Sequence, residues 1–393
     1  MLVFVVVLAA VVGAGAAVQL FRSVPTLRFA AAAPATITLP GTPPVIPWPS
    51  RGEATLAVQG AGVLGSSGGN APVAIASLTK VMTAYVVLAD HPLGTGQTGP
   101  PITMTAADAQ AYSVGLSQNQ SVVRVVPGEQ LTELQALQAA LIGSANNVAN
   151  ALAVWDAGST TAFVTKMNAA AAALDLHATR YNDATGLDSN SVSNATDQVV
   201  LATAAMSNPV FAGIVDLPQV TLPEAGIVYN YNSLVGHDGI VGIKTGSTLQ
   251  AGGCFIFAAE RTVAGHSAVV IGAVLGQQGP SILQAALSSA QKIIDAAAAS
   301  LQPVNVSPPS SVGRVTAAWG VARPVVAAGV TVLGWPGMTL AVKVKGRPLG
   351  DRLTDGQVVG TVTYTLGSQA QSVPARVSGA VAGPTLSWRL IRL

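Results

Sequence analysis

The spacing of apolar residues predicts a chain of mixed helices and strands. Residues 77–89 place apolar side chains close to helical spacing, and Pro92 ends the pattern. Similar patterns predict further helices over 132–142, 147–155, 163–174, 197–206 and 281–299. Short apolar runs predict strands over 54–59, 61–64, 240–244, 253–259 and 268–275, the first two as a hairpin around Gly60. We expect these elements to form one domain over residues 51–300.

Different patterns flank this domain on both sides. Prolines and serines crowd residues 301–313, which predicts an interdomain linker. Val-, Thr- and Gly-rich runs without a helical period follow, so residues 314–393 are expected to form a small β domain. On the amino-terminal side, six prolines between positions 34 and 49 predict an extended tether over residues 21–50.

The amino terminus carries an uninterrupted apolar run over residues 2–18, which spans roughly 25 Å as a helix. This run predicts export, through a signal peptide or an N-terminal membrane anchor over residues 1–20. We therefore expect the protein at the outer face of the cytoplasmic membrane, in the periplasm or in the cell wall. Ala14-Gly15-Ala16 resembles a signal-peptidase site, but no Lys or Arg precedes the run, and Arg22 and Arg28 follow it. Cleavage and retention both remain open.

Composition excludes several classes of function. A net charge of +2, with no cluster of Lys and Arg among aromatic residues, lacks the electrostatic signature of nucleic-acid binding. Cys254 is the only cysteine in the sequence, which excludes an internal disulfide and a thiolate zinc site. The four histidines are scattered without an H-E-x-x-H pair, so a metal hydrolase is unsupported and no cofactor is expected.

Three short motifs stand in order at boundaries of the predicted elements. Ser77-Leu78-Thr79-Lys80 opens the first helix, and Ser144-Ala145-Asn146 lies at the junction of the next two. Lys244-Thr245-Gly246 ends a strand. Their placement, together with their order, indicates a single active site rather than three unrelated matches.

The motif letters alone are weak evidence. S-x-x-K recurs at 289–292 and S-x-N at 117–119, neither in a comparable position. A G-x-S-x-G match at 65–69 leads into Asn70-Ala71-Pro72 rather than a helix, unlike a hydrolase nucleophile elbow. Each motif serine or lysine, considered singly, is more often a helix cap or a solvated charge.

The residue types suit nucleophilic catalysis. Helix positions i and i+3 share a face, so Lys80 Nζ can reach Ser77 Oγ. Burial beside the second cation, Lys244, would lower the pKa of Lys80 and let it accept a proton. Ser144 can then relay a proton to a leaving amine, and the Asn146 amide can bind the peptide group of the substrate.

The residues at the end of the predicted strand 240–244 are suited to bind a carboxylate at the end of a substrate. Lys244, Thr245 and Thr248 offer a cation and two hydroxyls for a carboxylate. Gly246 has no side chain, so a substrate strand can approach the edge closely.

The motifs and their surroundings resemble the serine-type D-alanyl-D-alanine carboxypeptidases, the low-molecular-mass penicillin-binding proteins. The likeness covers about residues 50–300, including 76–84, 128–132 and 238–248, and more weakly the C-terminal tail. It implies an α/β (α+β) DD-peptidase or β-lactamase-like serine hydrolase domain with an antiparallel sheet flanked by helices, followed by a small C-terminal β domain. It also implies removal of the terminal D-alanine from peptidoglycan stem peptides ending in D-Ala-D-Ala, through an acyl-serine intermediate, and acylation by β-lactams.

The resemblance implies a role for each motif residue. Ser77 would be the nucleophile, Lys80 the base and Ser144 the relay. The substrate-binding residues would be Asn146, Lys244, Thr245, Gly246, Ser247 and Thr248, and the backbone N–H groups of Ser77 and Ser247 would form the oxyanion hole. Asn147 departs from the family, which usually has Asp there. The familiar C-terminal amphipathic anchor is missing, so contact with the cell membrane would depend on residues 2–18, if they are not cleaved.

Alternative functions stay open at this stage. A class A β-lactamase needs a glutamate that activates the deacylating water, and residues 134–223 contain none. A catalytically silent peptidoglycan-binding protein would be indicated by a broken motif, and all three are intact. A DD-endopeptidase or transpeptidase would use the same residues, because the choice of acceptor depends on the shape of the cleft.

Overall fold

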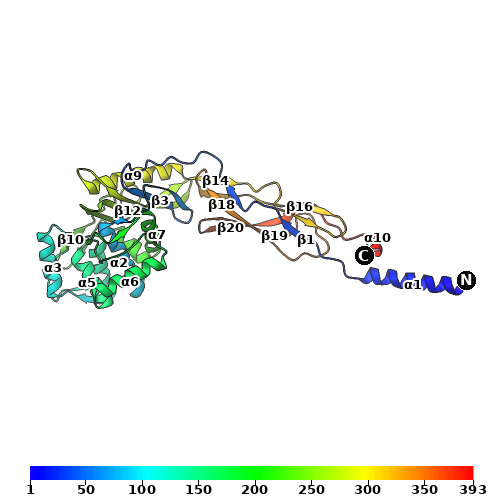
Figure 1. Ribbon diagram of the computed structural model, residues 1–393, viewed down its shortest axis with the longest axis horizontal. Helices are drawn as coiled ribbons and strands as arrows, with labels where there is room; N and C mark the ends of the chain where they lie inside the picture. The colour runs from blue at the N-terminus through cyan, green and yellow to red at the C-terminus, as the bar shows by residue number, and fades with distance from the viewer. Residues whose placement is uncertain (393) are drawn as a thin grey trace. The chain divides into compact units, whose positions relative to one another are not determined.

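The computed structural model describes residues 1–392 and divides the chain into two units. The larger unit runs from Pro44 to Leu301, where we expected 51–300. The smaller unit combines residues 1–43 with the chain from Gln302 onward. Both ends of the chain therefore belong to one unit, as the blue and red segments in Figure 1 show.

A five-stranded antiparallel sheet organises the larger unit, in the order β11, β12, β13, β3, β4. Its strands are β3 (Glu53–Val58), β4 (Gly62–Ser67), β11 (Ile240–Thr248), β12 (Gly252–Val263) and β13 (His266–Gln277). Residues 252–259 of β12 are all buried. Successive side chains of a strand point to opposite faces, so both faces of the sheet are covered. Figure 1 shows α9 on one side of the sheet and α2 and α7 on the other.

Helices form most of the rest of this unit. They are η1 (a 3₁₀ turn, Ala76–Leu78), α2 (Thr79–Asp90), α3 (Ala106–Ser117), α4 (Glu133–Leu141), α5 (Asn146–Ala157), α6 (Thr160–Ala173), α7 (Ala195–Met206), α8 (Pro209–Val215) and α9 (Ile282–Ser300). Short two-stranded ladders join β5 (Val73–Ala74) to β8 (Val192–Ser193), β6 (Pro101–Thr103) to β7 (Gln130–Thr132) and β9 (Gln219–Leu222) to β10 (Gly226–Tyr229). The predicted antiparallel sheet flanked by helices is confirmed.

Local sequence explains the ends of the helices around the motifs. Thr132 caps α4, accepting a 3.2 Å hydrogen bond from Gln135 N, while the Gln135 side chain accepts one from Thr132 N. Helix α5 ends at Gly158, whose φ of +75° is the left-handed conformation that glycine adopts without strain. These signals fix the outer ends of α4 and α5, the two helices that flank the second motif.

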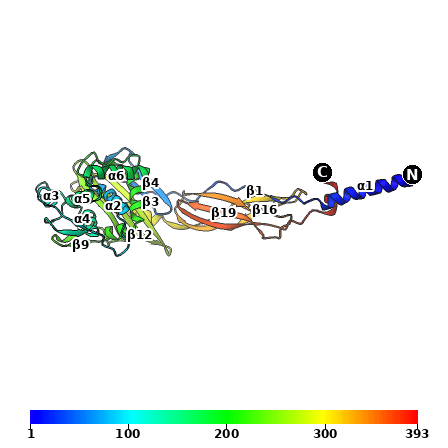
Figure 2. The ribbon, with the colours of Figure 1, turned by 90° about the horizontal axis from the view of Figure 1, so that it is seen from below.

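A seven-stranded sheet forms the smaller unit, in the order β1, β15, β16, β20, β19, β18, β2. Its strands are β1 (Arg28–Ala31), β2 (Thr36–Thr38), β15 (Gly313–Thr316), β16 (Ala322–Ala327), β18 (Thr339–Gly346), β19 (Val358–Leu366) and β20 (Gln369–Val377). A second ladder pairs β14 (Gln302–Val306) with β17 (Val330–Gly334). The Val- and Thr-rich C-terminal runs thus form β structure, as expected (Figure 2).

The amino-terminal segment differs from the expected tether. Within residues 21–50, β1 pairs with β15 and β2 pairs with β18, so these short strands form the two edges of the seven-stranded sheet. Within the expected linker 301–313, β14 pairs with β17. Proline is tolerated at sheet edges, and an extended segment can donate its backbone to an unpaired edge. The proline content therefore predicted that these segments are extended, but it did not predict which strands they pair with.

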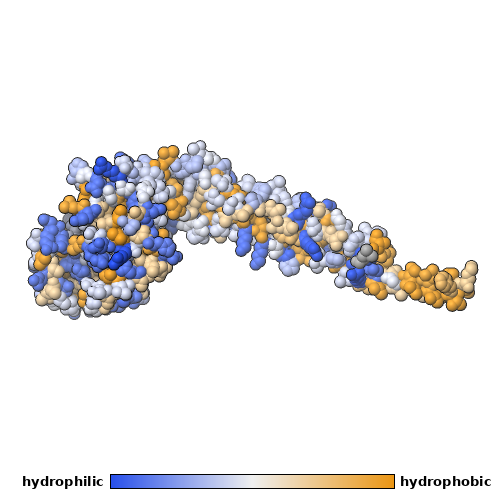
Figure 3. Space-filling view, viewed as in Figure 1, coloured by the Kyte–Doolittle hydropathy of each residue, from blue (hydrophilic) through white to orange (hydrophobic). Residues whose placement is uncertain are grey.

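Two terminal helices complete the smaller unit. Helix α1 (Leu2–Phe21) is long and apolar enough to cross a membrane, with a mean hydropathy of 2.5. None of its residues is buried. Figure 3 shows it as a continuous hydrophobic surface. Helix α10 (Leu386–Ile391) is a short helix capped by Thr385.

Candidate active site

Ser77 lies in a strained turn at the start of the first helix of the larger unit. Ala76, immediately before it, has a φ of +48°, which a residue with a Cβ rarely adopts. Leu78 N donates a 3.2 Å hydrogen bond to Ile75 O, which closes the turn. Ser77 is partly exposed while its neighbours in the turn are buried. The turn therefore leaves the serine side chain partly accessible while its neighbours are packed inside.

Lys80 is fully buried one turn further on, and its ammonium nitrogen has three oxygen partners. Nζ lies 3.0 Å from Ser77 Oγ, 2.7 Å from Asn146 Oδ1 and 2.7 Å from Thr185 O. The two amide oxygens can only accept hydrogen bonds. A neutral Lys80 would donate its two N–H groups to them, and its lone pair would then face the Ser77 hydroxyl. This arrangement suits removal of the hydroxyl proton.

The electrostatic environment favours the neutral form of Lys80. Burial is the main cause that holds its pKa well below the usual value, and the charge of Lys244 lowers that pKa further, while Asp183 partly opposes both. Burial also lowers the pKa of Lys244, to about 7. Lys244 Nζ donates a 3.1 Å hydrogen bond to Thr245 O. The charge of Lys244 thus favours the neutral form of Lys80, the form that can accept a proton.

The second motif lies between α4 and α5. Ser144 is buried and has a φ of +51°, a left-handed conformation that costs a serine on the order of 1 kcal/mol. The chain changes direction at this residue, and α5 begins at Asn146. The Asn146 N–H donates a 2.9 Å hydrogen bond to Ser121 O. Asn146 Nδ2 donates a 3.3 Å hydrogen bond to Gln120 Oε1. Within residues 1–392, the Ser144 hydroxyl has no hydrogen-bond partner, so it is free to contact a substrate.

The third motif lies on β11, which passes directly beside the serine turn. A Cβ placed on Gly246 would be 3.0 Å from Ser77 N and 3.2 Å from Leu78 N, so any side chain here would have to push the serine turn away by a few tenths of an ångström. Lys244 and Thr245 are buried and Ser247 is exposed. Of the predicted site residues, Ser77, Lys80 and Asn146 are in direct contact, and Gly246 is in contact with the Ser77 backbone.

Thr248 is already occupied as an acceptor. Its hydroxyl oxygen accepts a 3.0 Å hydrogen bond from Ala251 N, which closes the turn between β11 and β12. The hydroxyl hydrogen remains to be donated. Thr248 can therefore donate its hydroxyl hydrogen to an anionic group while it still accepts the bond from Ala251.

Asp183 and Thr185 were not among the site residues that the sequence predicted. The Asp183 carboxylate accepts hydrogen bonds from Gly186 N at 2.8 Å, Leu187 N at 3.0 Å and Ser191 Oγ at 2.6 Å. It also accepts one from the Thr185 hydroxyl. These bonds fix the turn so that Thr185 O faces Lys80. Asp183 is thus a positioning residue.

Gly186 lets this turn dock on the serine turn. Its φ is +81°, and a Cβ at this position would lie 1.8 Å from Ala76 O and 2.8 Å from the Thr79 hydroxyl. No side chain fits that space. The Asp-Ala-Thr-Gly run was the available signal, since aspartate commonly accepts hydrogen bonds from the backbone two to three residues later.

Asn147 has a structural role away from the catalytic groups. Its Oδ1 accepts a 3.1 Å hydrogen bond from Val123 N, and its Nδ2 donates a 2.8 Å hydrogen bond to Val123 O. An ionised aspartate, the usual family residue, could not make the second bond. Asn147 thereby fixes the segment that carries Gln120 and Ser121.

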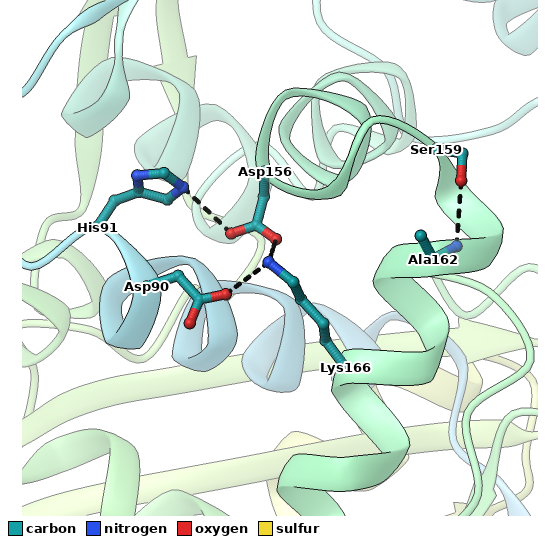
Figure 4. Close-up of polar contacts among 6 residues, drawn as sticks. All are labelled: Asp90, His91, Asp156, Ser159, Ala162 and Lys166. Carbon is teal, nitrogen blue, oxygen red and sulfur yellow. Dashed lines mark hydrogen bonds and ion pairs between the residues drawn. The ribbon is translucent and has the colours of Figure 1, made fainter.

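A buried carboxylate holds the far end of α2, as Figure 4 shows. The Asp156 side chain is fully buried, with Lys166 Nζ at 2.6 Å from Oδ1 and His91 Nε2 at 3.2 Å from Oδ2. Lys166 also lies 2.7 Å from Asp90. The cluster joins α2, α5 and α6, so the helix carrying Lys80 is fixed at both ends.

The chain is similar to known proteins across the larger unit. A sequence profile described as D-alanyl-D-alanine carboxypeptidase matches residues 54–275, more than half of the chain. A D-alanyl-D-alanine carboxypeptidase of Mycobacterium tuberculosis is 36% identical over 193 residues, 47% of this chain and 62% of the relative. A D-alanyl-D-alanine endopeptidase of Pseudomonas aeruginosa is 34% identical over 216 residues, 53% of this chain and 66% of the relative. The matches thus span slightly less than two thirds of each relative.

Solved structures extend the likeness in fold. Penicillin binding protein 5 from Haemophilus influenzae superposes with a TM-score of 0.62, covering 87% of this chain and 100% of that one, at 20% identity. At this identity the likeness concerns the fold alone. The match of the profile to residues 54–275 shows the family directly: the chain belongs to the D-alanyl-D-alanine carboxypeptidase family, peptidase family S11.

Proposed function

We propose that the protein is a serine-type D-Ala-D-Ala carboxypeptidase that removes the terminal D-alanine from peptidoglycan stem peptides. The observation that carries this proposal is the geometry at Lys80. Its nitrogen is 3.0 Å from Ser77 Oγ, while Asn146 Oδ1 and Thr185 O take its two hydrogens. The lysine is thereby held as a base for the serine.

In the acylation step, Ser77 Oγ attacks the carbonyl carbon of the penultimate D-alanine and its proton passes to Lys80 Nζ. The backbone N–H groups of Ser77 and Ser247 donate hydrogen bonds to the oxyanion that forms. When the peptide bond breaks, the leaving amine takes a proton from the Ser144 hydroxyl, and Lys80 returns one to Ser144. D-Alanine leaves, and Ser77 carries the rest of the peptide as an ester.

In the deacylation step, water attacks the ester and gives up a proton through the same groups. The ester bond breaks, Ser77 regains its proton, and the shortened peptide leaves with a free carboxylate. β-Lactams would acylate Ser77 in the same way. Because residues 134–223 contain no glutamate to activate water, we expect slow release of the penicilloyl group.

The strand end would bind the carboxylate of the terminal D-alanine. Burial lowers the pKa of Lys244 to about 7, and an anion beside it would favour its charged form. Thr245 and Thr248 would donate hydroxyl hydrogens to the same carboxylate. Asn146 keeps one amide hydrogen beyond its bond to Gln120, and this hydrogen would bind a substrate carbonyl.

The substrate implies a location outside the cytoplasm. Peptidoglycan lies beyond the cytoplasmic membrane, and the apolar helix α1 is consistent with export. We place the enzyme at the outer face of the membrane, with α1 as signal or anchor.

The proposal is tested with the purified full chain, a stem pentapeptide and fluorescent penicillin. We expect D-alanine release and labelling, both lost in Ser77→Ala and in Lys80→Met. The second S-x-x-K sequence provides matched controls, because Ser289 and Lys292 lie on α9, away from the site. Ser289→Ala and Lys292→Met should keep full activity. Labelling that persists in Ser77→Ala would refute the assignment.

The same test separates the alternatives. Because the chain is similar to an endopeptidase, a cross-linked stem-peptide dimer is tested as a second substrate beside the pentapeptide. Cleavage of the dimer at a higher kcat/KM than the pentapeptide would favour a DD-endopeptidase. Rapid steady-state turnover of penicillin would favour a β-lactamase, and labelling without any peptide cleavage would favour a silent binding protein.

A further inference from the structure

The last backbone carbonyls of helix α1 have unusual hydrogen-bond donors. Its 20 residues span about 30 Å, the thickness of a bilayer's hydrocarbon core. The last carbonyls of any helix lack partners within the helix and must find them elsewhere. At the end of α1 these partners come from the opposite end of the chain.

Two arginines of the α10 segment supply the missing donors. Arg392 Nη2 donates to Gln19 O at 3.1 Å, and Arg389 Nη1 donates to Leu20 O at 3.4 Å. Arg392 also donates to Ser23 O at 3.0 Å and to Arg22 O. In return, Gln19 Nε2 donates to Arg392 O at 3.1 Å. The guanidinium groups thus cap the helix end, where its dipole favours cations.

Helix α10 is held to the β sheet as well as to α1. Trp388 stands edge-on to Trp319, with ring centroids 5.7 Å apart, and the Arg392 guanidinium lies 5.4 Å from the Trp388 ring centre. Trp319 follows β15, and its Nε1 donates a 3.0 Å hydrogen bond to Ala382 O. Helix α10 therefore connects the end of α1 to the folded β unit.

We propose that α1 is retained as a permanent membrane anchor and that α10 is its cap, seated among the lipid headgroups of an anionic bilayer. Tryptophan is enriched at this depth, and arginine binds lipid phosphates. Leu386 and Ile391 of α10 are largely exposed, as is Phe21 at the end of α1. No acidic side chain among residues 1–392 forms an ion pair with Arg22, Arg389 or Arg392, so lipid phosphates are the available counter-charges.

Removal of residues 1–16 as a signal peptide would abolish this cap. Cleavage after Ala16 would leave residues 17–21, too few to remain helical without the preceding turns. Arg389 and Arg392 would then lose the ordered carbonyls that they cap. The cap is thus built for an uncleaved helix.

The test uses the full chain, expressed with export and extracted from the membrane fraction. We expect an intact mass that includes α1. A mature chain that begins at residue 17 would overturn the proposal. This result is independent of peptidase activity, which is measured on the same sample with the stem pentapeptide.

The cap itself is tested in nanodiscs by trypsin cleavage after Arg22. We expect Arg389→Ala/Arg392→Ala to accelerate this cleavage about ten-fold relative to wild type, because several hydrogen bonds at the site are lost. The matched control, Arg347→Ala, removes an exposed arginine of the same unit and should have no effect. Cleavage after Arg376 in β20 reports unfolding of the sheet and should stay unchanged.

The lipid partner is tested by changing the bilayer. Wild-type protection at Arg22 should be several-fold stronger in phosphatidylglycerol than in phosphatidylcholine, and the double variant should lose this difference. Equal protection in both lipids would refute the contact with anionic headgroups. Equal cleavage of the double variant and Arg347→Ala would refute the cap.

Discussion

Lys80 Nζ donates a 2.7 Å hydrogen bond to Asn146 Oδ1, so the second motif acts on the first through the lysine. The amide oxygen of Asn146 is committed to Lys80 and only its nitrogen faces other partners. Asn146 therefore positions Lys80 as well as being a candidate substrate ligand.

Asn146→Asp should shift the pH dependence of acylation. A carboxylate next to Lys80 would favour the ammonium form and raise the pKa that burial and Lys244 hold low. Because the base must be neutral, the acidic limb of kcat/KM should move upward by about 1–3 pH units. Penicillin acylation rates between pH 5 and 10 measure this shift. An unmoved acidic limb would contradict the role of Lys80 as base.

Gly246→Ala should impair acylation without unfolding the protein. The added methyl would lie 3.0 Å from Ser77 N and 3.1 Å from Ile75 O, both backbone atoms that cannot swing away. We expect the acylation rate to fall by about 10²-fold, the typical cost of a misplaced reacting group. Gly213→Ala on α8 is the control, since a Cβ there has no neighbour within 4 Å. Equal rates in both variants would show that the close approach is unimportant.

Asn147→Asp should destabilise the larger unit by about 1–3 kcal/mol. The substitution replaces the Nδ2 donor by a carboxylate oxygen that faces Val123 O across 2.8 Å. Urea unfolding followed by tryptophan fluorescence measures the loss. Asn150→Asp, on the same helix but only partly buried, should change the midpoint little. If both variants unfold at the same urea concentration, the pairing with Val123 contributes nothing measurable.

Glu133→Gln should change the pH dependence of stability. Burial raises the pKa of Glu133 from 4.5 to about 7, and neither carboxylate oxygen has a hydrogen-bond partner among the described residues. Since the folded pKa is the higher one, this group stabilises the fold fully below pH 4.5, and its contribution is lost as pH rises through 7.

The size of this effect is roughly 3 kcal/mol, at 1.36 kcal/mol per pH unit. Unfolding free energies of wild type and Glu133→Gln, measured from pH 4 to 8, should therefore diverge over that range. Glu224→Gln, an exposed substitution, should follow the wild-type curve. Parallel curves for wild type and Glu133→Gln would show that the side chain ionises freely in the folded protein.

Much of the larger unit could be predicted from local pattern. Apolar spacing predicted the helix that begins near Ser77 and the helix over residues 132–142, because such patterns act within a few residues. The three motifs predicted the candidate site by their positions at element ends, and the structure brings Ser77, Lys80 and Asn146 into contact. The edge strands β1 and β2 could not be predicted, because pairing between segments about 300 residues apart leaves no local signal.

Local sequence was enough to predict which residues would carry the chemistry: a serine and a lysine on one helix face, a serine and an asparagine at a helix junction, and a lysine on a strand. The folded structure was needed to show that Thr185 O and Asn146 Oδ1 take the hydrogens of Lys80, and that Asp183 holds the turn in place. These partners come from separate elements whose approach depends on packing and on glycines such as Gly186 and Gly246. The direction of a buried lysine's lone pair is set by such non-local contacts, and local sequence does not encode it.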